Sequence, residues 1–154
     1  MPPSLSWSLL EFHDLELQQL YDILQLRAEV FINEQRAVYA DPDGEDQKAL
    51  HLLGYDGDRL VAYSRLFAPG VKRKEAVLGR LCVARSHRGK GLGRTMIEKR
   101  LDWLRSHHPG CSAWTSLQLY RQPAYEKMGF RAISDVYAYD GEHIPHINML
   151  LEQV

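Results

Sequence analysis

The sequence predicts one α/β domain, residues 1–154, on a mixed and largely antiparallel sheet in the order β-α-β-β-β-α-β-α-β-β. Three observations indicate this class. Strand-like apolar runs flank two stretches whose apolar residues recur at helical spacing. An Asp-Gly-Asp turn at residues 56–58 separates two of these runs, as in an antiparallel hairpin. A glycine-rich turn at residues 88–93 joins a strand to a helix, which introduces one parallel step into the sheet.

The chain is expected to begin with a strand at residues 4–10 and a long helix that continues to about residue 34. Asp14 is a suitable N-cap for this helix. A loop with turn residues and no periodicity follows at residues 39–46, and it is predicted to be acidic and exposed. The predicted apolar face of the helix consists of Leu17, Leu20, Tyr21, Leu24, Ala28 and Phe31.

A meander of three strands is predicted next, at residues 50–55, 59–67 and 76–84. The third strand is apolar on both faces, as expected of a central strand. The helix after the glycine turn should end before Pro109, because proline disfavours helical backbone in the residue that precedes it. Its predicted apolar positions are Leu92, Met96, Ile97, Leu101, Trp103 and Leu104.

The last third of the chain is predicted to contain a strand at residues 111–117, a short helix and a closing hairpin. Pro123 is tolerated in the first turn of the short helix, and Gly129 is placed as its C-terminal cap. The hairpin is expected to pair residues 130–139 with residues 143–151 around a turn at Asp140 and Gly141.

Composition excludes several classes of function. Nineteen basic and 20 acidic residues leave a charge near zero, which argues against nucleic acid or an anionic membrane as partner. The sequence shows neither an apolar run of about 20 residues nor a signal-peptide pattern. Cys82 and Cys111 are predicted to be buried free thiols in a reducing compartment, so a cytoplasmic location is expected. The histidine pairs lack a ligand set for a metal.

The glycine-rich turn predicts a phosphate site. Glycines let the backbone approach a ligand closely, and N–H groups at the start of a helix point toward it. The dinucleotide pattern fails because Arg94 stands where its third glycine is required, and no P-loop spacing is present. The pattern that remains is Arg-x-x-Gly-x-Gly, from Arg88 to Gly93.

Two stretches carry a family resemblance. The sequence VARSHRGKGLG at residues 83–93 resembles the acetyl-CoA signature of the GNAT superfamily of N-acetyltransferases, and QLYRQPAYEKMGF at residues 118–130 resembles its second signature. Arg85, where many members have proline, and Pro123 depart from the pattern. The chain is similar to the ElaA-like branch along most of its length, at Leu24, Arg27, Val30, Phe31, Glu34, Gln35, Asp41, Asp43, Gly44, His51, Leu52, Gly79, Arg80, Val136, Tyr137, Asp140, Gly141 and residues 144–147.

The resemblance implies a GNAT-like fold, acetyl-CoA as acyl donor and a small-molecule or peptide amine as acceptor. It assigns the general acid that protonates the thiolate of CoA to Tyr125, a role that a phenol with a pKa of about 10 can fill. Gln118 is expected to hydrogen-bond the cofactor. The pantetheine arm is assigned to Leu81, Cys82 and Val83, and the pyrophosphate to Arg88, Gly89, Lys90, Gly91, Leu92 and Gly93.

Several questions stay open at the level of sequence. The base that deprotonates the amine is Glu34, Asp43, His51, His146 or water. The acidic loop is a candidate for attracting a cationic amine. Small domains of this type often dimerise, so a homodimer is one assembly that the resemblance allows.

Two other functions are weighed against transfer. The first is a CoA-binding sensor or interaction module that keeps the fold without transfer. The second is nucleic-acid binding through Arg94, Lys99, Arg100 and Arg105, for which a solvated helix face is the ordinary explanation.

Overall fold

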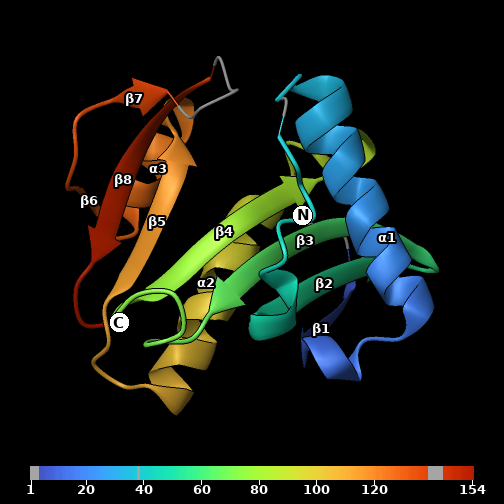
Figure 1. Ribbon diagram of the computed structural model, residues 1–154, viewed down its shortest axis with the longest axis horizontal. Coiled ribbons are helices and arrows are strands. Elements are labelled where there is room, and N and C mark those ends of the chain that lie inside the picture. The colour runs from blue at the N-terminus through green and yellow to red at the C-terminus, as the bar shows by residue number, and fades with distance from the viewer. Residues whose placement is uncertain (1–3, 38, 139–143) are drawn as a thin grey trace.

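The computed structural model describes residues 4–37, 39–138 and 144–154. In this part of the chain the strands form one eight-stranded sheet (Figure 1). The strands are β1 (Ser6–Glu11), β2 (Leu50–Asp56), β3 (Arg59–Phe67), β4 (Ala76–Val83), β5 (Ala113–Gln118), β6 (Arg131–Ala132), β7 (Tyr137–Ala138) and β8 (Pro145–Leu151). The α-helices are α1 (Leu17–Arg27), α2 (Leu92–His107) and α3 (Gln122–Lys127).

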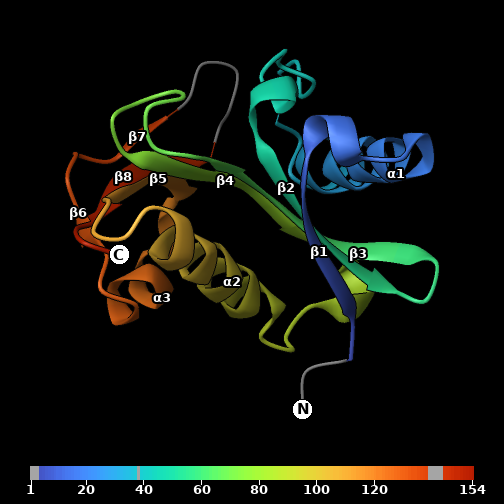
Figure 2. The same ribbon diagram turned by 90° about the horizontal axis from the view of Figure 1, so that it is seen from below.

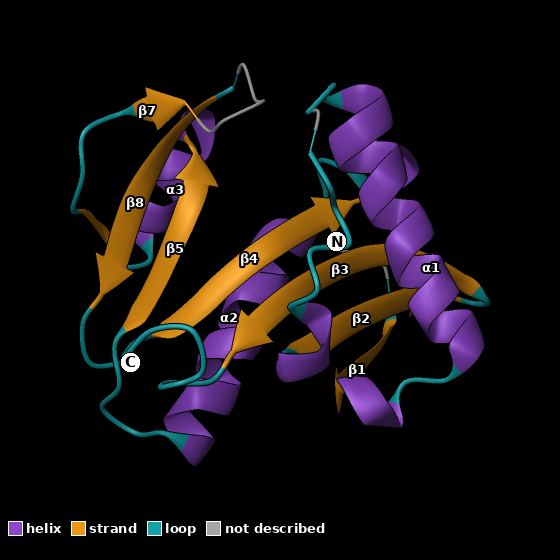
Figure 3. Cartoon of the chain, in the orientation of Figure 1, coloured by secondary structure: helices purple, strands orange, loops and turns teal. Residues whose placement is uncertain are grey.

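The sheet separates two layers of helices. Helix α1 covers one face, and α2 and α3 cover the other (Figures 2 and 3). One core cluster joins the strands to α2 and α3, through Leu101 and Tyr125 among others. A second cluster joins them to α1, through Ile23 and Leu26. The predicted α/β class with a mixed sheet is confirmed.

Strands β4 and β5 form the parallel step, and they pair over a short distance. Strands β1 to β4 are antiparallel neighbours, and β8 is antiparallel to β5. The register of β4 with β5 joins only Ala76–Leu78 to Ala113–Thr115. Figure 1 shows the two strands diverging from this common end. The second half of β4 therefore has no strand partner on the β5 side.

A β-bulge in β4 lies where the divergence begins. Tyr63 pairs with Cys82 and Arg65 pairs with Gly79, so β4 holds one residue more than β3 in this interval. Arg80 has a φ of 49°, a left-handed conformation that is uncommon outside glycine. The bulge bends β4 away from β5.

The first helix differs from the prediction at its start and in its internal geometry, and the helical run ends at Glu34 as predicted. Asp14 lies in a short 3-10 helix, and the N-cap is Glu16, which forms a capping box with Gln19. The α-helix ends at Arg27 and continues as a π-helical segment, Ala28–Glu34. The predicted apolar face is wrong at two positions, whereas Phe31 is buried as predicted and Leu20, Leu24 and Ala28 are half-buried. Leu17 and Tyr21 are exposed, and the buried side chains are Ile23, Leu26, Arg27, Val30 and Phe31.

The closing hairpin is less regular than predicted. Two short strands, β6 and β7, pair with β8 in place of one strand over residues 130–139. Between them Ser134 receives a hydrogen bond on its side-chain oxygen from the Asn148 N–H, at 3.0 Å. A side chain thus replaces the main-chain partner there. The predicted turn at Asp140 and Gly141 lies outside the described residues.

The acidic loop is exposed at residues 42–44, as the sequence predicts, but not at its two ends. Asp41 and Asp46 are buried. Arg27, which is fully buried, binds Asp41 through Nε and Asp46 through Nη1, each at 2.9 Å. Arg65 of β3 also reaches Asp46, at 2.8 Å. The loop is therefore fixed by ion pairs to α1 and to the sheet.

We expect R27M to be strongly destabilised. Methionine keeps much of the length of Arg27 but leaves Asp41 and Asp46 buried without that cation. Removing one partner of a buried ion pair costs about 3–5 kcal/mol. The free energy of unfolding in urea should fall by about 3 kcal/mol or more. R105M removes an exposed pair with Asp102 on α2 and should leave that free energy nearly unchanged. An R27M protein as stable as the wild type would contradict this role of the cluster.

Candidate functional site

The glycine-rich turn has the backbone that the sequence predicts. Gly89 and Gly91 have φ angles of 75° and 78°, in the left-handed region, and Gly91 is the N-cap of α2. The Thr95 N–H donates to the Gly91 carbonyl as the first bond of the helix. The N–H groups before Thr95 in this first turn therefore precede the helical ladder, which makes the turn a cradle for an anion.

A cavity of about 880 Å³ opens beside this turn, and we name it the glycine-loop cavity. Leu81 and Val83 of β4 line it, together with every predicted residue from Arg88 to Gly93 except Lys90. Cys82, between Leu81 and Val83, turns its side chain into the core under α1 and is 0% exposed. Burial raises the pKa of the Cys82 thiol to about 12, so this thiol is not a nucleophile at neutral pH.

Arg88 lines the glycine-loop cavity and is held there by two contacts. Its Nε donates to the Val83 carbonyl at 3.0 Å, and its Nη2 lies 2.6 Å from the Glu34 carboxylate. Arg85 approaches the same carboxylate at 3.9 Å. Glu34 therefore anchors Arg88 of the turn, which is a structural use for a residue that the sequence offers as a base.

A second cavity of about 300 Å³ lies where β4 and β5 diverge, and we name it the strand cavity. Residues from both strands line it, with side chains from the acidic loop and from α2. Leu81, Arg121 and Tyr125 line both cavities. The two cavities therefore meet at these three side chains.

Tyr125 is positioned by the short helix α3. Gly129 follows the helix with a φ of 97°, as expected of a C-terminal cap. This turn places Phe130 edge-to-face against Tyr125, with ring centroids 5.3 Å apart. Tyr125 is 4% exposed. A buried phenol at the junction of two cavities can donate a proton to a group bound in either one.

The predicted ligand Gln118 lies in a different place from the glycine turn. It lines the strand cavity, at the end of β5. Its Nε2 donates to Gln35 Oε1 at 2.7 Å, and Gln35 lines the glycine-loop cavity. The amide pair spans the space between the two cavities.

Two of the four candidate bases have environments that argue against the role. Burial alone would raise the pKa of Asp43, but the hydrogen bonds and charge of Arg65 lower it to about 2. Such a carboxylate is a weak proton acceptor. His51 is fully buried, with Nδ1 2.7 Å from the Tyr63 hydroxyl and Nε2 2.8 Å from the Asp46 carbonyl. Burial lowers its pKa, and it lines neither cavity.

The environment of His146 does not argue against the role of a base. It lies on β8, lines the strand cavity, and has Nδ1 2.7 Å from the Ile144 carbonyl. A carbonyl only accepts, so the neutral ring carries its proton on Nδ1 and its lone pair on Nε2. The Tyr137 ring lies beside the imidazole, with centroids 6.2 Å apart.

The sequence reasoning missed Arg100. The basic residues of α2 were expected on a solvated face, whereas Arg100 is 0% exposed and lines the strand cavity. The signal was present, because position 100 lies four residues after Met96 and four before Leu104 in the buried stripe. Burial lowers the pKa of Arg100, and neighbouring Tyr125 opposes that change.

Solved structures identify the fold as that of acyl-CoA N-acyltransferases. The crystal structure of an acyl-CoA N-acyltransferase from Pseudomonas aeruginosa matches with a TM-score of 0.90 and 36% identity, over 96% of this chain and 99% of that one. The crystal structure of Escherichia coli ElaA matches with a TM-score of 0.89 and 35% identity, over 97% of this chain and 100% of that one.

The family follows from the sequence as well. The model of the acetyltransferase (GNAT) family matches residues 17–130, and the chain belongs to that family. It is 36% identical to protein ElaA of Escherichia coli over 152 residues, which cover 97% of this chain and 98% of that protein. The GNAT and ElaA-like resemblance is confirmed, and the protein is an enzyme of the N-acetyltransferase type. GNAT acyltransferases use acyl-CoA and act on amine acceptors.

Two further findings concern residues 4–37, 39–138 and 144–154. No helix in these ranges has the length and apolar character needed to cross a membrane. No group of three or more His, Cys, Asp or Glu side chains in them is placed to hold a metal ion.

Acid is expected to unfold the protein through the loop carboxylates. Burial alone would raise the pKa of Asp46, but Arg27 and Arg65 outweigh it and lower that pKa, as they do for Asp43. Both carboxyls thus titrate below their unfolded value of about 3.9. Their stabilisation is complete above pH ~4 and is lost as the pH falls toward 2.

Urea midpoints at a series of pH values between 7 and 2.5 test this expectation. The midpoint should fall steeply below pH ~4, and D43N should weaken that dependence because one of the two titrating groups is gone. D102N, on the exposed face of α2, should follow the wild type. A midpoint that stays constant down to pH 3 in the wild type would contradict the assignment.

Proposed function

We propose that the protein transfers an acetyl group from acetyl-CoA to a primary amine by direct attack of the amine on the thioester. The observation that carries the proposal is the position of Tyr125, which borders both the glycine-loop cavity and the strand cavity. A donor in one cavity and an acceptor in the other would meet at this phenol. Membership of the GNAT family supports the same reading.

The glycine-loop cavity would hold the donor. The N–H groups of the turn and the charges of Arg88 and Lys90 suit a pyrophosphate, which needs several convergent donors. The pantetheine arm would lie along Leu81, Cys82 and Val83, where β4 has left β5 and its main-chain groups face the gap. The assignment of Cys82 rests on its main chain, because its side chain faces the core.

Gln118 fits this placement through Gln35. The end of the cofactor arm that carries the thioester would have to reach the junction of the cavities, where the amide pair spans them. Gln118 is therefore proposed to bind the end of the arm near the sulfur, and not the phosphates.

The reaction balances with the residues at hand. A neutral amine forms the new C–N bond at the thioester carbonyl, and a main-chain N–H near Val83 would stabilise the oxyanion. When the C–S bond breaks, Tyr125 donates its phenolic proton to the departing thiolate. The proton of the attached nitrogen passes to a base. His146 is the candidate that the geometry favours, because it lines the strand cavity and its Nε2 carries the lone pair.

We expect Y125F to lose transfer and keep CoA binding. Phenylalanine fills the same space without the proton donor, and general acid catalysis contributes about 10²- to 10⁴-fold. Thiol release in the presence of acetyl-CoA and a panel of primary amines should show kcat reduced at least about 100-fold, with the calorimetric Kd for CoA unchanged. Y21F, on the exposed face of α1, is the matched control.

Two outcomes would contradict the proposal. If Y125F transfers as fast as the wild type, Tyr125 is not the acid. If the wild type binds CoA and acetylates no amine across a broad panel, the protein is better described as a CoA-binding sensor or interaction module.

A further inference from the structure

The strand cavity has an excess of positive charge. One carboxylate, Asp43, and one histidine, His146, line it. The cationic side chains in its wall are more numerous and are Arg65, Lys72, Arg80, Arg100 and Arg121. This composition is the opposite of what a site for a cationic acceptor would need.

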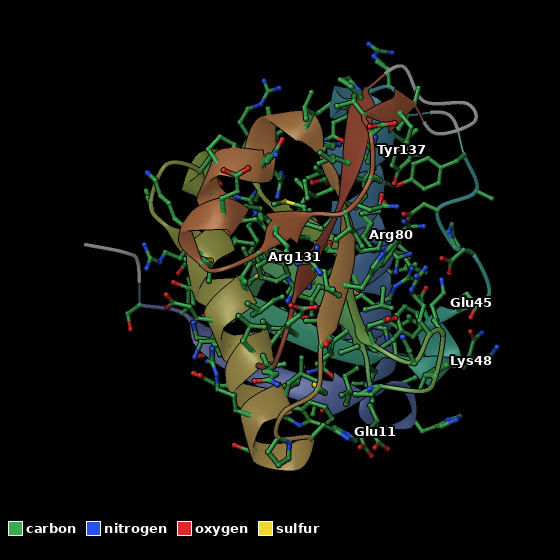
Figure 4. All side chains as sticks on the ribbon, turned by 90° about the vertical axis from the view of Figure 1, so that its left-hand side faces the viewer. Glu11, Glu45, Lys48, Arg80, Arg131 and Tyr137 are labelled. Atoms are coloured by element: carbon green, nitrogen blue, oxygen red, sulfur yellow. The ribbon has the colours of Figure 1, made fainter. Side chains whose placement is uncertain are left out.

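The acidic loop offsets only part of this excess, because its carboxylates pair with Arg65 and Arg80 and leave Lys72, Arg100 and Arg121 without a carboxylate among the described residues. Arg65 binds Asp43 at 2.9 Å. Arg80 lies 3.2 Å from Asp41 and 3.3 Å from Asp43. Figure 4 shows Arg80 and Glu45 on the side of the molecule where this loop runs. The loop aspartates are thus paired with Arg27, Arg65 and Arg80, and Glu45 is paired with Lys48, so the expectation that the loop attracts a cationic amine is not supported.

Arg100 is a buried cation without an acidic partner. Its Nε donates to the Met96 carbonyl at 3.3 Å and its Nη1 to the Arg65 carbonyl at 3.1 Å. Its Nη2 is buried and forms no well-aligned hydrogen bond among the described residues, and the neutral Tyr125 side chain is the group that lies within hydrogen-bonding reach of the guanidinium. No described carboxylate lies within 4.0 Å of the guanidinium. Burying a charge is costly unless it is paired, so this arrangement indicates a group that the bound state supplies.

Arg121 adds a second guanidinium to the same cavity. It follows β5 in a short 3-10 turn, and its Nε donates to the Tyr120 hydroxyl at 3.0 Å. No described carboxylate pairs with it either. The planar fork of a guanidinium matches a carboxylate, often with two parallel hydrogen bonds. The cavity wall that contains Tyr125 therefore also contains two guanidinium groups, Arg100 and Arg121, that a carboxylate could bind.

We propose that Arg100, assisted by Arg121, forms a subsite in the strand cavity that binds a carboxylate carried by the substrate. The proposal rests on the proposed function and names its substrate class. The carboxylate belongs either to the amine acceptor, as in an amino acid, or to the acyl group, as in a dicarboxylic acyl-CoA. A cavity of about 300 Å³ suits a small molecule of this kind. With the carboxylate on Arg100, the reacting end would lie toward Tyr125, which lines the same cavity.

A binding experiment tests the subsite without requiring transfer. Trp114 lines the strand cavity, so its fluorescence should report occupancy. N-acetyl amino acids and their carboxamides are titrated into the CoA-bound protein. We expect the acids to bind at least about tenfold more tightly than the amides. This preference should disappear in R100M and persist in R105M, where an exposed arginine of the same helix is replaced.

A transfer experiment identifies the source of the carboxylate. With acetyl-CoA, amino acids are compared with the corresponding carboxamides; with a carboxamide acceptor, succinyl-CoA is compared with acetyl-CoA. If kcat/KM is about tenfold higher for amino acids than for their carboxamides, and R100M abolishes this difference, the carboxylate belongs to the acceptor. If kcat/KM is about tenfold higher with succinyl-CoA than with acetyl-CoA, and R100M abolishes this difference, the carboxylate belongs to the acyl group. R100K keeps the positive charge without the planar guanidinium and should retain part of the preference for the carboxylate. This variant allows the test to be made if R100M does not fold.

The outcomes that overturn the two proposals differ. Transfer and binding without any carboxylate preference, or a preference that survives in R100M, would overturn the subsite and leave the acetyltransferase proposal standing. Absence of transfer to every amine would overturn the proposed function, while the fluorescence titration would still decide whether the cavity binds a carboxylate through Arg100.

Discussion

Strands β4 and β5 are hydrogen-bonded over only three residues each, and the two cavities depend on this short pairing. A longer parallel ladder would close the gap. The divergence follows from a local cause, the extra residue at the Arg80 bulge, which turns β4 away from its neighbour. A left-handed arginine is an unfavourable backbone conformation, so other contacts must hold it. The ion pairs of Arg80 with Asp41 and Asp43 are such contacts.

The same ion pairs link elements that are far apart in the sequence. Arg27 from α1 and Arg65 from β3 hold the loop carboxylates from the other side. One charged cluster therefore ties the first helix, the loop and the bulged strand together. Hydrophobic side chains in place of this charged cluster could give equal stability. They would not pair with the loop carboxylates, as the cluster does, while Arg100 and Arg121 stay available to the strand cavity. The balance of charge in the cavity is thus a result of how the loop folds.

Local patterns in the sequence were sufficient to predict the order of helices and strands along the chain up to the closing hairpin, the glycine turn and the cap at Gly129, because each depends on neighbouring residues. Features decided by tertiary contacts were not predictable in this way. Glu16 and not Asp14 caps α1, since only Glu16 forms the reciprocal bond with Gln19. The sequence predicts Asp41 and Asp46 as exposed turn residues, because their ion pairs with the distant Arg27 are visible only in the structure. Arg100 could have been recognised as buried from its spacing with Met96 and Leu104, but its charge argued for solvent.

The glycine turn and Arg100 lie at different positions of helix α2 and face different cavities. The start of α2 presents main-chain N–H groups to the glycine-loop cavity, and Arg100, about two turns later, faces the strand cavity. Both ends of the proposed reaction would then be held by anionic groups, the phosphates on one side and a carboxylate on the other. Holding two reactants by groups remote from the reacting atoms converts an encounter in solution into an oriented approach. Tyr125 lines both cavities, so helix α2 would fix the separation of the two bound groups on either side of this phenol in the proposed reaction.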